Sequence, residues 1–181
     1  MDAKAPEIHT IEEFYETSVN ERIELIHGVF YNMAPPNRLH QRILSILHTR
    51  IFNYIENKGG DCEVYPAPFG VQLSEEDDTV VEPDISVICD PKKLTDRGCT
   101  GAPDWIIEIV SPGNPSHDYL TKKSLYMTSG VREYWIIDPA GLKIGVYTSN
   151  EPDRPAVYDF TDTVRVGIYE DLEIDFSKIK L

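Results

Sequence analysis

The sequence has no long hydrophobic run and no sign of a targeting segment at its start. Nothing in it approaches the roughly eighteen consecutive apolar residues that a membrane-spanning helix requires. Residues Met1 to Glu7 lack the basic and then apolar pattern of a secretory signal peptide. We therefore expect a soluble, cytoplasmic protein with no membrane partner.

Cysteine is scarce as well. The chain has three cysteines, an odd number, and their spacing matches neither a zinc-binding CxxC pair nor the disulfide framework of a small secreted domain. We expect Cys62, Cys89 and Cys99 to be thiols in a reducing compartment.

Basic residues are outnumbered, 17 against 31 acidic ones, which gives a net charge of −14. Such a charge opposes non-specific binding to a nucleic acid backbone. One segment, Asn37–Lys58, has a positive charge instead. It holds a single acid, Glu56, and four basic residues, which are Arg38, Arg42, Arg50 and Lys58. A solvated helix face is the simpler interpretation of this basic segment, and a phosphate-contacting face is the alternative.

What the sequence does contain suits one folded domain. With 181 residues, 41% of them hydrophobic, the chain is long enough for a single well-buried domain over residues 1–181. We expect residues 1–9 to form a flexible tail. No internal repeat or low-complexity segment is present.

Acidic residues interrupt two runs of β-branched side chains. Asp84 lies within Thr79–Ile88 and Glu108 within Asp104–Val110, and each run is typical of a strand buried on both faces. An ionised carboxylate in an apolar sheet costs on the order of several kcal/mol unless it is paired, hydrogen-bonded or bound to a metal. Two such acids on nearby strands therefore suggest one shared positive partner.

Lysines follow the second acid in the next helix-like segment, Ser116–Ser129, at Lys122 and Lys123. Two acids and a lysine fit a divalent-metal site in which the lysine steers a nucleophile. They fit a structural ion-pair cluster equally well. Helical spacing alone does not choose between the two lysines.

The clearest helix is Asn37–Lys58, in which apolar residues recur at helical spacing until Gly59 and Gly60. His40 lies one turn into it and is a functional candidate, although a lone histidine beside an apolar stripe is more often structural. Before it we expect a short helix over Thr10–Ser18, capped by Thr10, and a hairpin over Arg22–Met33 that turns at His27 and Gly28. Glu24 on this hairpin is either solvent-facing or a third acid of the site.

The remaining pattern defines the fold class. After the long helix come strand segments over Cys62–Leu73, Val80–Ile88 and Asp104–Val110, a connecting loop over Asp90–Pro103, the helix Ser116–Ser129 and a strand over Val131–Pro139. Further strands are expected over Lys143–Thr148, Ala156–Phe160 and Thr163–Val166, followed by an extended tail over Ile168–Leu181. This order predicts an α/β (mixed α+β) protein whose mixed β-sheet is flanked by helices, with extra N- and C-terminal strands.

A set of short motifs, spread over most of the chain, resembles the Uma-type family of restriction endonucleases, a bacterial branch of the PD-(D/E)XK nuclease superfamily. The motifs are Glu24-Leu-Ile-His-Gly28, His40, Pro83-Asp84, Glu108-Ile-Val-Ser-Pro112, Asp118, Lys122, Tyr126, Gly130-Val131 and Glu133-Tyr-Trp-Ile-Ile-Asp-Pro139. The combination is specific, whereas any single motif is weak.

The resemblance implies a restriction-endonuclease-like αβββαβ core and a set of site residues. Asp84 and Glu108 would bind Mg²⁺ or Mn²⁺, the backbone carbonyl of Ile109 could add a ligand, and Lys122 would orient the attacking water. In the superfamily this lysine usually lies two residues after the Glu, where this chain has Val110. Oxygen ligands suit a hard cation such as Mg²⁺ or Mn²⁺ better than zinc.

By the same resemblance, Glu24 could bind a second metal or tune the first, and His40 could hydrogen-bond the scissile phosphate or a water. The leading hypothesis is a metal-dependent endonuclease that hydrolyses DNA, as a homodimer if it cuts both strands. The alternative is a nuclease-fold protein that binds nucleic acid or a protein partner without cutting. The acidic net charge favours the alternative and the retained Asp, Glu and Lys favour the nuclease; a small-molecule hydrolase is a third hypothesis.

Overall fold

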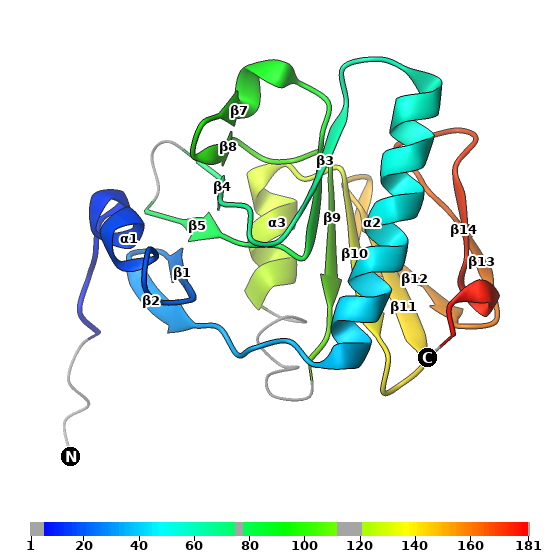
Figure 1. The fold of residues 1–181 in the computed structure, drawn as a ribbon, viewed down its shortest axis with the longest axis horizontal. Helices are drawn as coiled ribbons and strands as arrows, with labels where there is room; N and C mark the ends of the chain where they lie inside the picture. Colours follow the sequence, from blue (N-terminus) through cyan, green and yellow to red (C-terminus); the bar gives the residue numbers. More distant parts are fainter. Residues whose placement is uncertain (1–5, 75–77, 112–120, 181) are drawn as a thin grey trace.

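A computed structural model of the chain describes residues 6–74, 78–111 and 121–180 (Figure 1). Its central feature is a six-stranded sheet in the order β12-β11-β10-β9-β6-β3. β9 and β10 are parallel and the other neighbours are antiparallel. The strands are β3 (Glu63–Pro66), β6 (Ile85–Ile88), β9 (Trp105–Ile109), β10 (Glu133–Asp138), β11 (Lys143–Thr148) and β12 (Glu151–Asp159).

Helices cover both faces of this sheet. α2 (Arg38–Lys58) packs Ile43, Leu47 and Ile51 on one face, in one cluster with Trp105 and Trp135. α3 (Lys123–Ser129) packs Leu125 and Tyr126 on the other face. The chain order α2, β3, β6, β9, α3, β10 confirms the expected αβββαβ core, with insertions between its strands.

The local sequence explains α2. Asn37 is its N-cap, and the Asn37 side chain accepts a hydrogen bond from the His40 amide at 2.9 Å. The helix ends at Gly59, whose φ of 69° lies in the region that glycine adopts without strain. The predicted bounds of this helix are confirmed.

The predicted strand over Val80–Ile88 is wrong as a single element. It is divided into β5 (Val80–Val81) and β6, which belong to different sheets. Pro83 lies at the division. Since proline has no amide hydrogen to donate to a strand ladder, it favours the end of the strand at this point. Asp84 therefore occupies the crossing point between two sheets rather than the middle of one strand.

A second six-stranded sheet, in the order β2-β1-β5-β4-β8-β7, was not expected. It combines β1 (Ile23–Ile26) and β2 (Val29–Asn32) of the predicted hairpin with four very short strands. These are β4 (Val71–Gln72), β5, β7 (Leu94–Thr95) and β8 (Gly98–Thr100). The predicted loop over Asp90–Pro103 is thus partly folded, with a 3₁₀ turn at Pro91–Lys93 before β7.

The two ends of the described chain are held by the body of the protein. Thr10 is the N-cap of α1 (Ile11–Thr17), as predicted, and it forms a capping box with Glu13. Of the tail expected over residues 1–9, residues 1–5 lie outside the described residues, and the His9 amide donates to the Gly28 carbonyl at 2.7 Å. The C-terminal segment forms a two-stranded sheet of β13 (Thr163–Arg165) and β14 (Glu173–Asp175), then a 3₁₀ turn at Phe176–Lys178.

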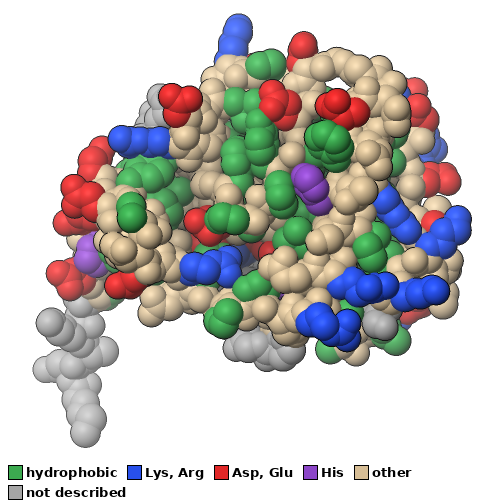
Figure 2. Space-filling view, in the orientation of Figure 1, with side chains coloured by type: hydrophobic (Ala, Val, Ile, Leu, Met, Phe, Trp, Pro, Cys, Tyr) green, Lys and Arg blue, Asp and Glu red, His purple; other side chains and the backbone are tan. Residues whose placement is uncertain are grey.

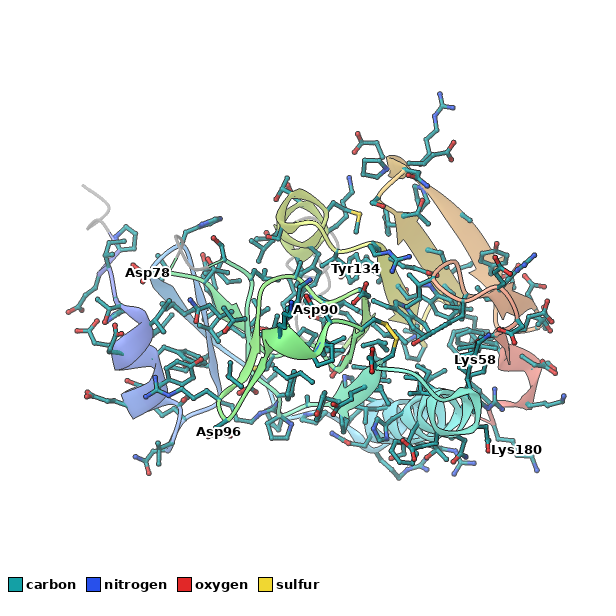
Figure 3. All side chains as sticks on the ribbon, turned by 90° about the horizontal axis from the view of Figure 1, so that it is seen from above. Lys58, Asp78, Asp90, Asp96, Tyr134 and Lys180 are labelled. Atoms are coloured by element: carbon teal, nitrogen blue, oxygen red, sulfur yellow. A yellow bond between two sulfur atoms is a disulfide. The ribbon has the colours of Figure 1, made fainter. Side chains whose placement is uncertain are left out.

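The expectation of three free thiols is wrong for two of them. Cys62 and Cys89 form a disulfide, visible in Figure 3. The antiparallel register of β3 and β6 pairs Glu63 with Ile88, which brings the flanking cysteines opposite one another. Cys99 is a buried thiol, and burial raises its pKa to about 11.

No helix among the described residues is long and apolar enough to cross a membrane.

Candidate active site

A pocket of about 590 Å³ lies where the N-terminal hairpin, the start of α2 and the end of β9 meet. Its walls include every residue that the sequence singled out for the site, and the structure brings all of them together. These residues are Glu24, His40, Asp84, Glu108, Ile109 and Lys122.

Lys122 is the centre of a buried charge cluster in this pocket. Its Nζ donates to Glu24 Oε1 at 2.9 Å and to Glu108 Oε1 at 3.0 Å, and its side chain is only 4% exposed. Both carboxylates are buried as well. The ammonium therefore compensates two acids that come from different sheets. This ion pairing offsets the desolvation free energy of the buried carboxylates.

The structure distinguishes the two neighbouring lysines that spacing left open. Lys123, one position further, points away from the pocket and donates to Asp153, whose side chain is 88% exposed. Lys122 directly precedes α3, so it projects from the end of the helix toward the pocket.

Tyr126 supports Glu108 from the next turn of the same helix. Its hydroxyl donates to Glu108 Oε1 at 2.7 Å. Burial, reinforced by the Glu108 carboxylate, raises the pKa of Tyr126 well above its usual value, so the hydroxyl keeps its proton. The sequence named Tyr126 only as part of a motif, and the bond to Glu108 gives it a positioning role.

Asp84 is held from two directions. Its Oδ2 accepts from the Ile109 amide at 2.7 Å and lies 3.0 Å from His40 Nε2. The Ile109 amide therefore contacts Asp84 directly, and the Ile109 carbonyl stays a predicted metal ligand. The Nδ1 atom of His40 is buried and has no hydrogen-bond partner among the described residues.

Glu24 is fixed by the strand that leads to Asp84. Its Oε1 accepts from the Glu82 amide at 3.0 Å as well as from Lys122. Glu82 itself is half-buried, and burial raises the pKa of its carboxyl group, an effect that Arg22 and Lys122 reduce. The solvent-facing alternative for Glu24 is thus wrong, because only 3% of the residue is exposed.

The carboxylate oxygens of the pocket suit a hard cation that binds only one or two protein side chains. Within residues 6–74, 78–111 and 121–180, no group of three or more His, Cys, Asp or Glu side chains has the geometry to enclose a metal ion. Mg²⁺ commonly takes one or two carboxylates and keeps several waters. Asp84 and Glu108, which line one pocket with His40, fit that pattern, and His40 Nδ1 is a buried polar atom without a hydrogen-bond partner among the described residues.

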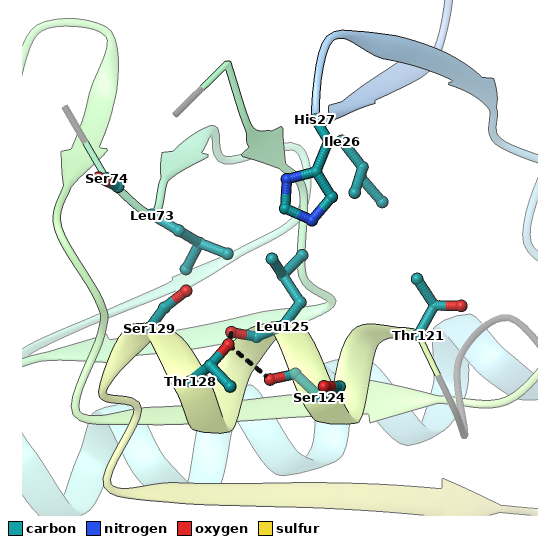
Figure 4. A pocket seen from close by; sticks show the side chains of 9 residues that line it. All are labelled: Ile26, His27, Leu73, Ser74, Thr121, Ser124, Leu125, Thr128 and Ser129. Carbon is teal, nitrogen blue, oxygen red and sulfur yellow. Dashed lines mark hydrogen bonds between the residues drawn. The ribbon is translucent and has the colours of Figure 1, made fainter. Parts of the chain in front are cut away.

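A larger cavity of about 730 Å³ lies elsewhere, between the β1–β2 turn and α3 (Figure 4). The described residues that line it carry hydroxyl, aliphatic and imidazole groups and no carboxylate. They are Ile26, His27, Leu73, Ser74, Thr121, Ser124, Leu125, Thr128 and Ser129. Its chemistry therefore differs from that of the pocket with Asp84 and Glu108.

Comparison with known proteins shows the fold and the family of the chain. A solved structure titled as a putative nuclease belonging to DUF820, from Anabaena variabilis, superposes with a TM-score of 0.76 at 22% identity, over 94% of this chain and 96% of that one. An uncharacterized protein of Synechocystis is 26% identical over 138 residues, which is 76% of this chain and 71% of that protein. The family model of Uma2, described as "Putative restriction endonuclease", matches residues 11–177. The chain belongs to the Uma2 family of restriction-endonuclease-like proteins.

Proposed function

We propose that this protein is a divalent-metal-dependent endonuclease that hydrolyses phosphodiester bonds of DNA. The observation that carries the proposal is the convergence of Asp84, Glu108 and Lys122 on one pocket. Membership of the Uma2 family supports a nuclease activity.

In this proposal Asp84 and Glu108 hold Mg²⁺ or Mn²⁺, with the Ile109 carbonyl as a further candidate ligand, and Glu24, which accepts from Lys122, tunes this ion or binds a second one. When bound, such an ion polarises a phosphoryl oxygen and lowers the pKa of a coordinated water. Lys122, held between Glu24 and Glu108, orients the attacking water and stabilises the negative charge that develops on the phosphoryl group. His40, beside Asp84, donates a hydrogen bond to the scissile phosphate or to a water.

Plasmid nicking tests this proposal. The wild-type protein should nick supercoiled DNA with Mg²⁺ or Mn²⁺ and not with EDTA, and Asp84→Ala should abolish nicking. Asp96→Ala, which removes an exposed carboxylate from the β7–β8 turn, is the matched control and should cut like wild type. The proposal fails if wild type cuts neither double- nor single-stranded DNA with either metal, or if Asp84→Ala cuts equally well.

A second candidate is a nuclease-fold protein that binds nucleic acid or a protein partner without cutting. It is favoured by the observation that the acids of the pocket already have partners within the protein: Lys122 pairs with Glu24 and Glu108, and His40 Nε2 lies 3.0 Å from Asp84 Oδ2. A metal that binds only the folded state at 100 times its Kd would stabilise it by about 2.7 kcal/mol. Thermal stabilisation by Mn²⁺ that Asp84→Ala removes, without nicking, would identify a metal-binding protein that does not cut.

The proposal extends to assembly and location. One active site per chain cuts one strand, so cleavage of a duplex calls for a homodimer, which sedimentation would detect. A DNA substrate suits the cytoplasm that is expected from the sequence. In that compartment, thiol reductants would act on the Cys62–Cys89 disulfide.

A further inference from the structure

The outward face of α2 carries a stripe of polar and basic side chains. Gln41 and Arg42 lie three and four residues after Arg38, and Ser45 lies four and three residues after them, so the four side chains lie on one side of the helix, and all are exposed. In Figure 2, Lys and Arg side chains gather at the lower right, over the start of α2 and the C-terminus. This concentration is notable in a chain whose net charge is −14.

The stripe is continuous with the candidate active site. Gln41 lines the pocket of Asp84 and Glu108 and also borders a shallow hollow of about 460 Å³. The other residues of that hollow are Arg38, Arg42, Ser45 and Ile46. Arg22, which directly precedes β1, contributes a further guanidinium to the wall of the pocket. A polyanion that crosses the pocket would therefore meet cations from the N-terminal hairpin and from α2.

The arginines of the stripe are not used to compensate acids of the protein. Within the part of the chain that the structure describes, neither Arg38 nor Arg42 forms an ion pair, although Lys58, near the other end of α2, pairs with Asp171. Their guanidinium groups are therefore open to an external anion.

The C-terminal segment holds one of these arginines in place. Arg42 donates from Nε to the Lys180 carbonyl at 2.8 Å. That bond leaves the four N–H groups on the terminal nitrogens of the guanidinium for other acceptors. Lys180, which lies beside α2 in Figure 3, adds an exposed ammonium to the same region.

We propose that Arg38, Gln41, Arg42, Ser45 and Lys180 form a surface that binds the sugar-phosphate backbone of a DNA strand leading into the pocket. Arg38 and Arg42 are about 6 Å apart along the helix axis, close to two nucleotide steps of about 3.4 Å each. The choice of DNA as the ligand rests on the proposed function. The choice of surface rests on charge and position alone.

Fluorescence anisotropy tests the surface without cleavage. Binding of a labelled 20-base-pair duplex is measured in EDTA over a range of salt concentrations, for wild type, Arg38→Gln and Arg38→Gln/Arg42→Gln. The matched control is Arg97→Gln/Arg154→Gln, which removes two exposed guanidiniums, one from the β7–β8 turn and one from the edge strand β12. The single variant guards against a folding effect, because Arg38, unlike Arg42, makes no hydrogen bond to the C-terminal segment among the described residues.

Counterion release sets the expected size. Each lost phosphate contact should reduce the slope of log K against log salt by about 0.9, and should weaken binding about eightfold in 0.1 M salt. The double variant should then bind about 60-fold more weakly, and its slope should fall by about 1.8. The single variant should show half of that change in slope. The control should lose less than about twofold in affinity.

The inference is overturned if wild type does not bind the duplex, if both α2 variants bind like wild type, or if the control loses as much affinity as the double variant. These outcomes are separate from those of the nicking assay. Binding through α2 without cleavage would retain the surface and remove the proposed function, whereas cleavage with unchanged binding by the α2 variants would do the reverse.

Discussion

Lys122→Met should have a large effect on stability, because it removes the ammonium that lies between two buried carboxylates. Glu24 and Glu108 are 3% and 5% exposed, and each is within 3.0 Å of Lys122 Nζ. Removing one partner of a buried pair costs about 3–5 kcal/mol, because the other charge is left without compensation. The folding free energy of a domain is only about 5–15 kcal/mol, so the loss should be large enough to measure easily.

Lys123→Met is a close control, since it removes the same side chain one position away. Lys123 pairs with Asp153, whose side chain is 88% exposed, and an ion pair with such a solvated partner contributes little. Urea unfolding should give a much lower midpoint for Lys122→Met and a nearly unchanged one for Lys123→Met. Adding Glu24→Gln to Lys122→Met should restore part of the loss, because it removes one of the two uncompensated charges.

The same pair of variants tests the proposed chemistry. Loss of one group that stabilises developing charge lowers the rate about 10²–10³-fold, so Lys122→Met should lose nicking by that factor while Lys123→Met retains it. The reasoning is refuted if the two variants unfold at the same urea concentration, or if Lys123→Met loses nicking as severely.

Three further substitutions probe the supports of the site and the second sheet. Tyr126→Phe removes a buried hydroxyl that donates to Glu108 at 2.7 Å and should cost about 1.5–3 kcal/mol in urea unfolding, with the fold retained in circular dichroism; no loss would show that this bond is unimportant. Glu82→Gln should raise the melting temperature at pH 8 and progressively less toward pH 4. The folded-state pKa of Glu82 is raised, so the native protein binds more protons than the unfolded chain and loses stability as pH rises through that pKa; an equal shift at all pH values would contradict this. Gly98→Ala should unfold the chain or lower its melting temperature severely, because a Cβ there would lie 2.0 Å from the Gly70 carbonyl oxygen, and wild-type stability would contradict the packing of the second sheet.

The sequence allowed the αβββαβ core to be predicted because its elements are long or strongly patterned. α2 runs for 21 residues between a side-chain cap and a glycine, and β9 and β10 are rich in β-branched and aromatic residues. The second sheet escaped prediction because four of its strands have only two or three residues, too few to show a period of two. The sequence contains Pro83 within this run. Whether the chain passes from one sheet to another at that proline depends on tertiary structure.

The residues of the site were identified by their chemistry and by family resemblance, and their contacts were not. A buried acid needs a partner, which pointed to a cation near Asp84 and Glu108. That Lys122 bridges Glu108 to Glu24, and that His40 reaches Asp84, follows from how the N-terminal hairpin and α2 pack against β9. The Cys62–Cys89 disulfide was missed for the same reason, since strand register, which the spacing of cysteines does not reveal, pairs these residues.

A crystal soaked with Mn²⁺ tests the central claim most directly, because the anomalous signal of the ion locates it without reference to activity. We predict a peak about 2 Å from carboxylate oxygens of both Asp84 and Glu108, lost in Asp84→Ala crystals. A pocket without a peak at saturating Mn²⁺, or an ion bound elsewhere in the protein, would contradict the account.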